Sequence, residues 1–230
     1  MELRSLVATA SRVVAGHGGG DLIWGHVSAR DEDRDGYWIK QSGWGLEEIT
    51  AERVHLLDRD GAILEGAGPR HVEYPIHAEV YAERPDVGGV VHVHSRSAVA
   101  LAARGTPLLP VSHEGNYFAP HGVPRFTRTA DLITTAELGA AVAEVLGEAA
   151  GIFLVNHGVV TVGPDLPSAV LAAIVLERAC EVQLACGGGS GEGLSWSDPA
   201  ESLAKREHIY GGTASEQVWR YLVRRLDGAD

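Results

Sequence analysis

Two histidines alternate with valines in residues 90–95, directly after a turn-forming segment rich in proline and glycine. Valine-rich alternation predicts a β-strand, in which residues i and i+2 face the same side. His92 and His94 are therefore expected to present two imidazoles on one face, with Val91 and Val93 on the other. Such a pair is half of a metal site if a third ligand lies elsewhere. Taken alone, it is equally compatible with two polar positions on an ordinary strand.

Charge and composition restrict the kinds of partner. The net charge is −12, from 19 basic and 31 acidic residues, which argues against nucleic acid or an anionic membrane as the main partner. Cys180 and Cys186 are six residues apart in a helical pattern and poorly placed for a disulfide. No signal peptide is recognisable, and Glu177 and Arg178 interrupt the longest apolar run. We therefore expect a cytoplasmic protein whose partner is a small molecule.

Helical and strand patterns are mixed along the chain. Helices are predicted from Leu3 to Gly16, after Pro75, after Ser95, after a capping box at 134–137 and over 168–186. Strands are predicted over 22–30, 37–43, 54–58, 62–64, 108–111, 152–155 and 158–162. Hairpin signals are frequent and strict βαβ alternation is absent, which favours a mixed, largely antiparallel sheet flanked by helices.

We expect a single domain over residues 1–230. Within it, residues 187–193 are rich in glycine and predict a flexible linker. The aromatic tail after the linker needs an apolar partner surface, either this core or a neighbouring subunit.

Two further residues extend the histidine pair. Glu73 precedes a predicted helix, whose dipole favours a carboxylate there, although a solvated acid is the plain interpretation. His157 lies in the turn Asn156-His157-Gly158 between two predicted strands, where a stiff scaffold exposes a ligand. With His92 and His94 it makes three nitrogen ligands and leaves one position open, the pattern of a catalytic divalent site. Glu73 is then a fourth ligand or an acid/base.

Other polar positions are weaker candidates. The loop at Ser42 and Gly43 has free N–H groups that suit an anion, but most such loops are only turns. His113 lies in a polar cluster at the end of the predicted strand 108–111 and is a candidate for the rim of the site. His55 is expected on a strand surface. His77, four residues after Glu73, could touch the same region, but a role on a helix face is favoured.

Six short motifs contain most of these candidate residues. They are Gly25-His26-Val27-Ser28-Ala29-Arg30, Ser42-Gly43, Glu73-Tyr74-Pro75-Ile76-His77-Ala78-Glu79-Val80-Tyr81, Arg84-Pro85-Asp86-Val87, Val90-Val91-His92-Val93-His94-Ser95 and Asn156-His157-Gly158. In order and spacing they resemble the class II aldolase/adducin family, over about residues 3–186. The resemblance implies a three-layer α/β/α fold. It also implies a homotetramer with active sites between neighbouring subunits.

The resemblance also implies roles for individual residues. His92, His94 and His157 match the metal ligands, with zinc typical and manganese or iron found in some relatives. Glu73 matches the family's acid/base, and Tyr210 matches C-terminal tyrosines that reach a neighbour's site. Retro-aldol cleavage and decarboxylation both pass through an enolate, which a Lewis-acidic metal stabilises.

Several positions depart from the sugar-phosphate members of the family. Those members bind phosphate with an Asn, where this chain has His26, and with a Ser-Ser pair, where it has His71 and Val72. A Tyr that follows a His in the aldolases is replaced here by Glu114. The Gly-His-Val-Ser pattern resembles members that decarboxylate unphosphorylated acids.

We therefore expect a metal-dependent carbon–carbon lyase, with decarboxylation favoured over aldol cleavage. Its substrate is expected to be a small, unphosphorylated oxo or hydroxy acid. The residues expected to bind it are His26, Ser42, Gly43, His71 and His113. The alternatives are a sugar-phosphate aldolase or epimerase, a non-haem iron oxygenase on the same scaffold, and an adducin-like interaction module without chemistry.

Overall fold

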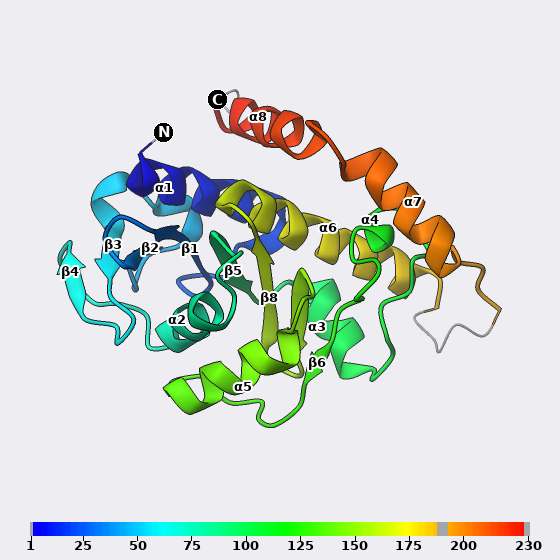
Figure 1. Ribbon diagram of the computed structural model, residues 1–230, viewed down its shortest axis with the longest axis horizontal. Coiled ribbons are helices and arrows are strands. Elements are labelled where there is room, and N and C mark those ends of the chain that lie inside the picture. The colour runs from blue at the N-terminus through cyan, green and yellow to red at the C-terminus, as the bar shows by residue number, and fades with distance from the viewer. Residues whose placement is uncertain (1, 188–192, 228–230) are drawn as a thin grey trace.

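The computed structural model describes residues 2–187 and 193–227, and its centre is a mixed sheet (Figure 1). In the described residues the sheet has eight strands in the order β4-β3-β2-β1-β5-β8-β7-β6. All neighbours are antiparallel except β6 and β7. The strands are β1 His26–Asp31, β2 Gly36–Lys40, β3 Val54–Leu57, β4 Ile63–Glu65, β5 Gly89–Val93, β6 Arg125–Phe126, β7 Gly151–Leu154 and β8 Gly158–Gly163.

Helices cover both faces of this sheet, so the predicted three-layer α/β/α architecture is confirmed (Figure 1). Helices α2 and α5 pack on one face, and α1, α3 and α6 pack on the other. The helices are α1 Leu3–Val14, η1 Ala15–Gly19, η2 Leu46–Glu48, η3 Ala51–Arg53, α2 Tyr74–Glu83, α3 Arg96–Ala103, α4 His113–Asn116, α5 Ala136–Leu146, α6 Leu166–Ala185, α7 Pro199–Tyr210 and α8 Ala214–Asp227.

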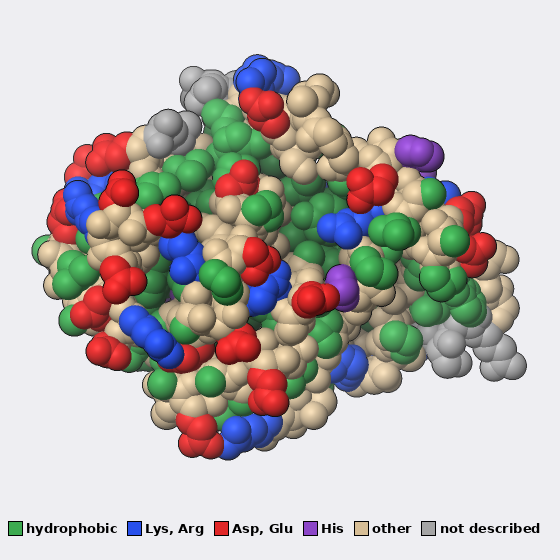
Figure 2. Space-filling model, viewed as in Figure 1, with side chains coloured by type: hydrophobic (Ala, Val, Ile, Leu, Met, Phe, Trp, Pro, Cys, Tyr) green, Lys and Arg blue, Asp and Glu red, His purple; other side chains and the backbone are tan. Residues whose placement is uncertain are grey.

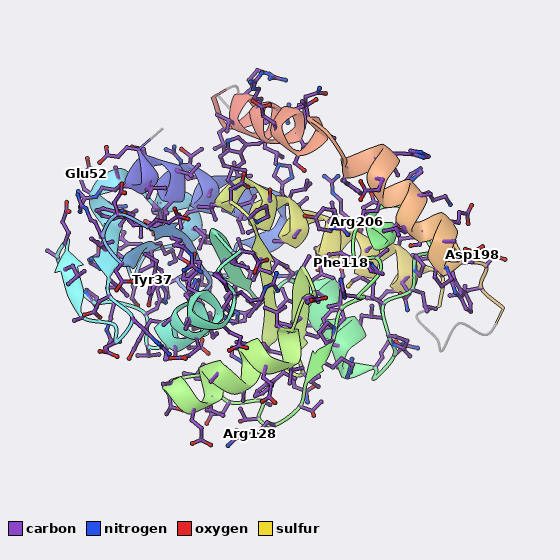
Figure 3. The ribbon with its side chains drawn as sticks, viewed as in Figure 1. Tyr37, Glu52, Phe118, Arg128, Asp198 and Arg206 are labelled. Carbon is purple, nitrogen blue, oxygen red and sulfur yellow. The ribbon has the colours of Figure 1, made fainter. Side chains whose placement is uncertain are left out.

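Strand β5 has the predicted alternation. Val91 and Val93 belong to the apolar cluster beneath α1 and α6, whereas Val90 belongs to the cluster beneath α2 and α5. Tyr37, labelled in Figure 3, lies in the same cluster as Val90. His92 has the same parity as Val90, so it faces the side of α2, and His94 follows the last residue of the strand. The metal-site candidates are thus presented toward the N-terminal end of α2.

Two predicted strand segments are wrong. Residues 22–24 form an exposed loop in which Leu22 is 71% exposed, and the strand begins only at His26. Leu22 and Gly25 both have positive φ values, which turn the chain before the strand starts. No strand forms over 108–111, because Pro110 lacks an N–H and the Leu109 N–H bonds to the Gln183 side chain instead.

Helix starts also differ by a few residues. Thr135, rather than Thr134, caps α5 by accepting the Leu138 N–H. Asp165 caps α6, so this helix begins at Leu166 instead of Ser168. In both helices the start is set by the residue whose side-chain oxygen accepts the N–H of the residue three positions later.

The C-terminal helices lie along one edge of the molecule. Apolar residues of α8, among them Trp219 and Leu222, pack on the cluster formed by α1 and α6. The tail therefore contacts this chain's own core. Of the predicted linker, residues 188–192 lie outside the described residues. None of the described helices is long and apolar enough to cross a membrane.

Lys40 ends strand β2 with its side chain fully buried. Its ammonium donates to the carbonyl oxygens of Ile23 (3.1 Å) and Trp44 (2.5 Å), which ties the two loops at this end of the sheet. Among the described residues no carboxylate lies within ion-pairing distance of it. Burial lowers the pKa of Lys40 to about 8.

We predict that Lys40 makes folding stability rise with pH between about 8 and 10.5. In this window the unfolded chain still binds the proton that the folded chain has released, so the free energy of unfolding increases. The total rise is about 3 kcal/mol. Denaturant unfolding at several pH values should show this rise in the wild type and not in Lys40→Met.

The chain's other lysine, Lys205, provides the matched control, because it lies on the surface of α7. Lys205→Met should keep the rise. An equal rise in the Lys40→Met protein would show that Lys40 is not its source.

Candidate metal centre and active site

Glu73, His92, His94 and His157 converge on one point. Each offers one ligand atom, and these atoms all lie within 4.8 Å of one another. Glu73 immediately precedes α2, the first two histidines lie in and after β5, and His157 lies in the turn between β7 and β8. The four residues predicted from the sequence are therefore brought together.

Pairing of β5 with β8 produces this convergence. Val93 lies opposite Val159, so the turn before β8 is adjacent to the end of β5. Asn156 adopts φ 61° to make that turn tight. Gly158 is required because a Cβ there would lie 2.7 Å from both the His94 ring and the Val93 carbonyl oxygen. The short turn therefore places the His157 ring against the β5 histidines, with ring centroids 5.1 Å from His92 and 5.3 Å from His94.

The histidine nitrogens fit a divalent ion. The Nδ1 of His92 lies 3.0 Å from the carbonyl oxygen of Val159, which only accepts, so Nδ1 carries the proton and Nε2 keeps a lone pair. That Nε2 and both ring nitrogens of His157 are buried, and among residues 2–187 and 193–227 they have no hydrogen-bond partner. Burial lowers the pKa of His92 to about 3, so its ring is neutral. Buried polar atoms are rarely left unpaired, and a metal would satisfy Nε2 of His92 and one of the two nitrogens of His157.

Asp21 orients the third histidine. Its Oδ2 lies 2.7 Å from Nδ1 of His94, so Nε2 is the nitrogen left for a metal. Carboxylates in this position fix the ring and make it a stronger ligand. The sequence analysis missed Asp21, because an acid in a glycine-rich loop 73 residues away carries no signal of this contact.

Glu73 is buried rather than solvated, with 7% of its surface exposed. Its Oε1 accepts the Ile133 N–H at 2.8 Å and lies 3.5 Å from Nε2 of His157, and its Oε2 lies 3.8 Å from Nε2 of His92. Burial alone would raise the pKa of Glu73, but His157, His92 and the Ile133 N–H together lower it to about 2. The carboxylate is therefore ionised and adjacent to the ligand atoms.

Two predicted substrate residues adjoin this centre. The ring of His26 lies 4.4 Å from that of His71 and 4.9 Å from that of His92, between centroids. Nε2 of His71 is buried without a partner. Burial and the charge of Lys40 lower the pKa of His71 to about 3. Both imidazoles are therefore neutral groups beside the metal ligands.

The predicted loop at Ser42 lies beside His71. The Ser42 N–H donates to the Pro69 carbonyl oxygen at 3.0 Å, which joins the loop to the segment before His71. Gly43 is exposed and has φ +86°. The backbone at Gln41 contacts His71 and favours its charged form. These contacts place the loop next to the histidine group without showing that it binds a ligand.

Two further histidines are buried, His55 where a strand surface was expected and His77 where a helix face was favoured. His77 is fully buried, because its side of α2 packs on the sheet, and its Nε2 lies 2.6 Å from Nδ1 of His26. His55 is also buried, with Nε2 3.3 Å from the Pro69 carbonyl oxygen. Local patterns miss both, since each burial depends on an element distant in sequence.

His113 and Tyr210 lie together elsewhere. The Tyr210 hydroxyl donates to the His113 carbonyl oxygen at 3.3 Å, and the Tyr210 ring packs edge-on against Tyr117. Within the described part of the chain neither residue contacts the four converging side chains. Their roles stay predictions that depend on a neighbouring subunit.

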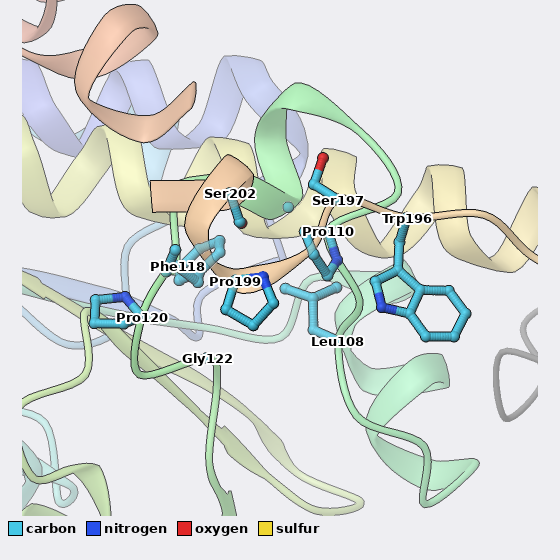
Figure 4. Close-up of a pocket in the computed structure, with 11 residues that line it drawn as sticks. Leu108, Pro110, Phe118, Pro120, Gly122, Trp196, Ser197, Pro199 and Ser202 are labelled. Atoms are coloured by element: carbon cyan, nitrogen blue, oxygen red, sulfur yellow. The ribbon is translucent and has the colours of Figure 1, made fainter. Parts of the chain in front are cut away.

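A cavity of about 220 Å³ lies between the 108–122 segment and α7 (Figure 4). Phe118 and Trp196 line it, and a second hollow beside it includes His113. Neither hollow shares a lining residue with the group of Glu73 and the three histidines. On the face shown in Figure 2 acidic side chains are spread widely, in keeping with the net charge of −12.

The comparisons with known proteins agree with this geometry. A family model described as the class II aldolase and adducin N-terminal domain matches residues 5–184. The chain belongs to the class II aldolase and adducin family. A crystal structure of an aldolase II superfamily protein from Pseudomonas syringae matches this fold with a TM-score of 0.88 and 27% identity. That match covers 99% of this chain and 93% of the other. The predicted family and fold are both confirmed.

Relatives within the class II aldolase family indicate its chemistry. The chain is 35% identical to 3,4-dihydroxyphthalate decarboxylase of Terrabacter sp. (strain DBF63), over 97% of this chain and 96% of that protein. It is 29% identical to the protein of the same name from Arthrobacter keyseri, over 98% of this chain and 94% of the other. Family and relatives together support a lyase, as the sequence analysis predicted.

We predict that Asp21→Asn weakens metal binding by about 10-fold to 100-fold while the fold is retained, because the amide orients His94 without its charge. A zinc titration against a chelator of known affinity measures the change. Asp33→Asn, in the exposed turn before β2, is the matched control and should bind zinc like the wild type. Wild-type affinity in Asp21→Asn would exclude a role for Asp21 in the metal centre.

Proposed function

We propose that this protein is a metal-dependent carbon–carbon lyase that decarboxylates a small, unphosphorylated acid carrying a hydroxyl or oxo group. One observation carries the proposal. A buried, ionised Glu73 lies beside histidine nitrogens that have no other partner. A carboxylate base next to an open coordination position is the arrangement that proton transfer to or from an enolate requires.

We propose that His92, His94 and His157 hold the metal. Three imidazoles suit zinc first, and manganese or iron as well. When bound, a divalent ion supplies Lewis acidity that stabilises negative charge on a substrate oxygen. Glu73 is held by the Ile133 N–H on one oxygen. With the other oxygen it takes the proton of the substrate's hydroxyl group and returns that proton to the carbon that loses carbon dioxide.

The substrate class follows from the neighbours of this centre. His26 and His71 are neutral imidazoles at the positions where sugar-phosphate members have amide and hydroxyl groups. Val72 is 57% exposed and offers no hydrogen bond. These replacements favour a carboxylate or phenolic oxygen over a phosphate. Ser42 and Gly43 would bind the same end of the substrate. An aromatic dihydroxy dicarboxylate, as in the name of the relatives, fits this description.

We further propose a cytoplasmic homotetramer with active sites between subunits. Leu22, Ile23 and Trp24 are exposed apolar residues directly after Asp21, the partner of His94. A second copy that covers them would lie at the metal centre. His113 and Tyr210, the proposed second catalytic residue, lie away from the metal centre of their own chain. In the tetramer they would lie at the metal centre of a neighbouring subunit. Both cysteines are free, in keeping with a reducing compartment.

We predict that Glu73→Gln keeps the metal but lowers kcat by about 100-fold to 10,000-fold, because the amide cannot take up a proton. His94→Ala should lose both metal and turnover. Metal content by elemental analysis and single-turnover kinetics separate the two effects. Glu83→Gln, at the exposed end of the same helix, is the control. Near wild-type turnover in Glu73→Gln would eliminate Glu73 as the acid/base.

The reaction itself is tested by carbon dioxide release. The zinc-, manganese- or iron-loaded protein, incubated with 3,4-dihydroxyphthalate without oxygen, should release carbon dioxide. Turnover that requires oxygen would favour the oxygenase alternative. Aldehyde formation from a ketose phosphate, with no carbon dioxide from any acid tested, would favour a sugar-phosphate aldolase.

A further inference from the structure

A chain of short hydrogen bonds leads away from the metal centre through His26. Its Nδ1 lies 2.6 Å from Nε2 of His77, whose Nδ1 lies 2.6 Å from Oγ of Ser28. The Ser28 hydroxyl in turn lies 2.7 Å from the hydroxyl of Tyr81. All four residues are buried, so each of these polar groups depends on the next for a partner.

Matching spacings in two elements build this chain. His26 and Ser28 are two residues apart on β1 and therefore face the same side of the sheet. His77 and Tyr81 are four residues apart on α2 and therefore lie on one face of the helix. Because α2 packs on that side of the sheet, the two pairs interleave. None of these contacts uses a residue of the predicted metal triad.

One direction of the hydrogen bonds gives every proton between Tyr81 and His26 an acceptor within the chain. His26 and His77 are both buried, and in the described part of the chain neither hydrogen-bonds a carboxylate, so each ring is neutral and carries a single N–H. In one direction Tyr81 donates to Ser28, Ser28 donates to Nδ1 of His77, and Nε2–H of His77 donates to Nδ1 of His26. The opposite direction ends on the Tyr81 oxygen and needs another acceptor for the Tyr81 proton.

The surroundings of Tyr81 supply no such acceptor. Among the described side chains Ser28 is the one hydrogen-bond partner of the Tyr81 hydroxyl, which the backbone of Val90 also contacts. Burial raises the pKa of Tyr81, while the Ser28 hydroxyl, the Arg30 charge and the Val90 backbone lower it. Apart from Ser28, whose hydroxyl can donate or accept, these neighbours are not acceptors. The Arg30 guanidinium lies 4.7 Å from the Tyr81 ring centroid. An unpaired buried hydroxyl proton is costly, so donation by Tyr81 is favoured.

We propose that the Tyr81–Ser28–His77 chain holds His26 as the tautomer that carries its proton on Nε2. His26 then presents a directed N–H donor beside His71 and the metal ligands. Such a donor selects substrates with a carboxylate or phenolic oxygen at this point. Tyr81, Ser28 and His77 act as positioning residues, since they reach substrate only through His26. The choice of ligand rests on the proposed function, whereas the tautomer does not.

Two matched tyrosine variants test this proposal. Tyr81→Phe removes the hydroxyl that sets the direction of the chain. Tyr37→Phe removes a neighbouring buried hydroxyl that has no partner, on a ring stacked 6.3 Å from His77. Long-range ¹H–¹⁵N spectra of the zinc-loaded, histidine-labelled protein report the tautomer, and His26→Gln identifies the His26 signals.

The wild type and Tyr37→Phe should show His26 protonated at Nε2, and Tyr81→Phe should show a mixture of tautomers. His77→Gln keeps a donor toward His26 and should retain the Nε2–H form, whereas His77→Leu should lose it. A wild-type His26 protonated at Nδ1 would overturn the proposal. Unchanged His26 signals in both Tyr81→Phe and His77→Leu would overturn it as well.

Binding of phthalate, an unreactive ortho-dicarboxylate, tests the ligand class by calorimetry. Loss of a directed hydrogen bond to a carboxylate should weaken binding roughly tenfold in His77→Leu. His77→Gln and Tyr37→Phe should bind like the wild type. Absence of phthalate binding to the wild-type protein would overturn the carboxylate assignment and count against the proposed substrate class. The ¹⁵N spectra need no turnover and would still decide the tautomer.

Discussion

Antiparallel pairing of β5 with β8 is the constraint on which the metal centre depends. It sets the short turn before β8 against the end of β5, so a histidine from each side reaches the same point. Gly158 allows this approach because it has no side chain to meet the His94 ring. Helix α2, which packs on the same side of the sheet, then brings Glu73 to the remaining open side.

Burial of polar groups is the second feature of this site. Removing an imidazole or a carboxylate from water is costly, so each such group needs a partner. Glu73 has the Ile133 N–H, His94 has Asp21, and Lys40 has two loop carbonyls. The buried nitrogens of His92 and His157 that lack a protein partner lie where a metal would bind. Desolvation also keeps His92 neutral, as ligation requires.

A good part of this arrangement could be predicted from residue patterns. Valine alternation located β5 and the face of His92, and the Asn-His-Gly turn located His157 between two strands. The helix start at Pro75 placed Glu73 before α2. The errors came where proline or a distant side chain replaced ladder hydrogen bonds, as at Pro110 and Leu109. The burial of His77 could not be decided from the sequence, because its i+4 spacing from Glu73 does not reveal which helix face meets the sheet.

The sequence by itself determined the class of fold, the metal-site candidates and the family, because period-2 and helical patterns and short motifs are local properties. Only the tertiary structure decided that Asp21 supports His94 and that His26 is linked through His77 and Ser28 to Tyr81. These partners are between 49 and 73 residues apart. Their contacts arise from packing of α2 and the 20–25 loop against the sheet, and such long-range packing leaves no periodic signal in the chain.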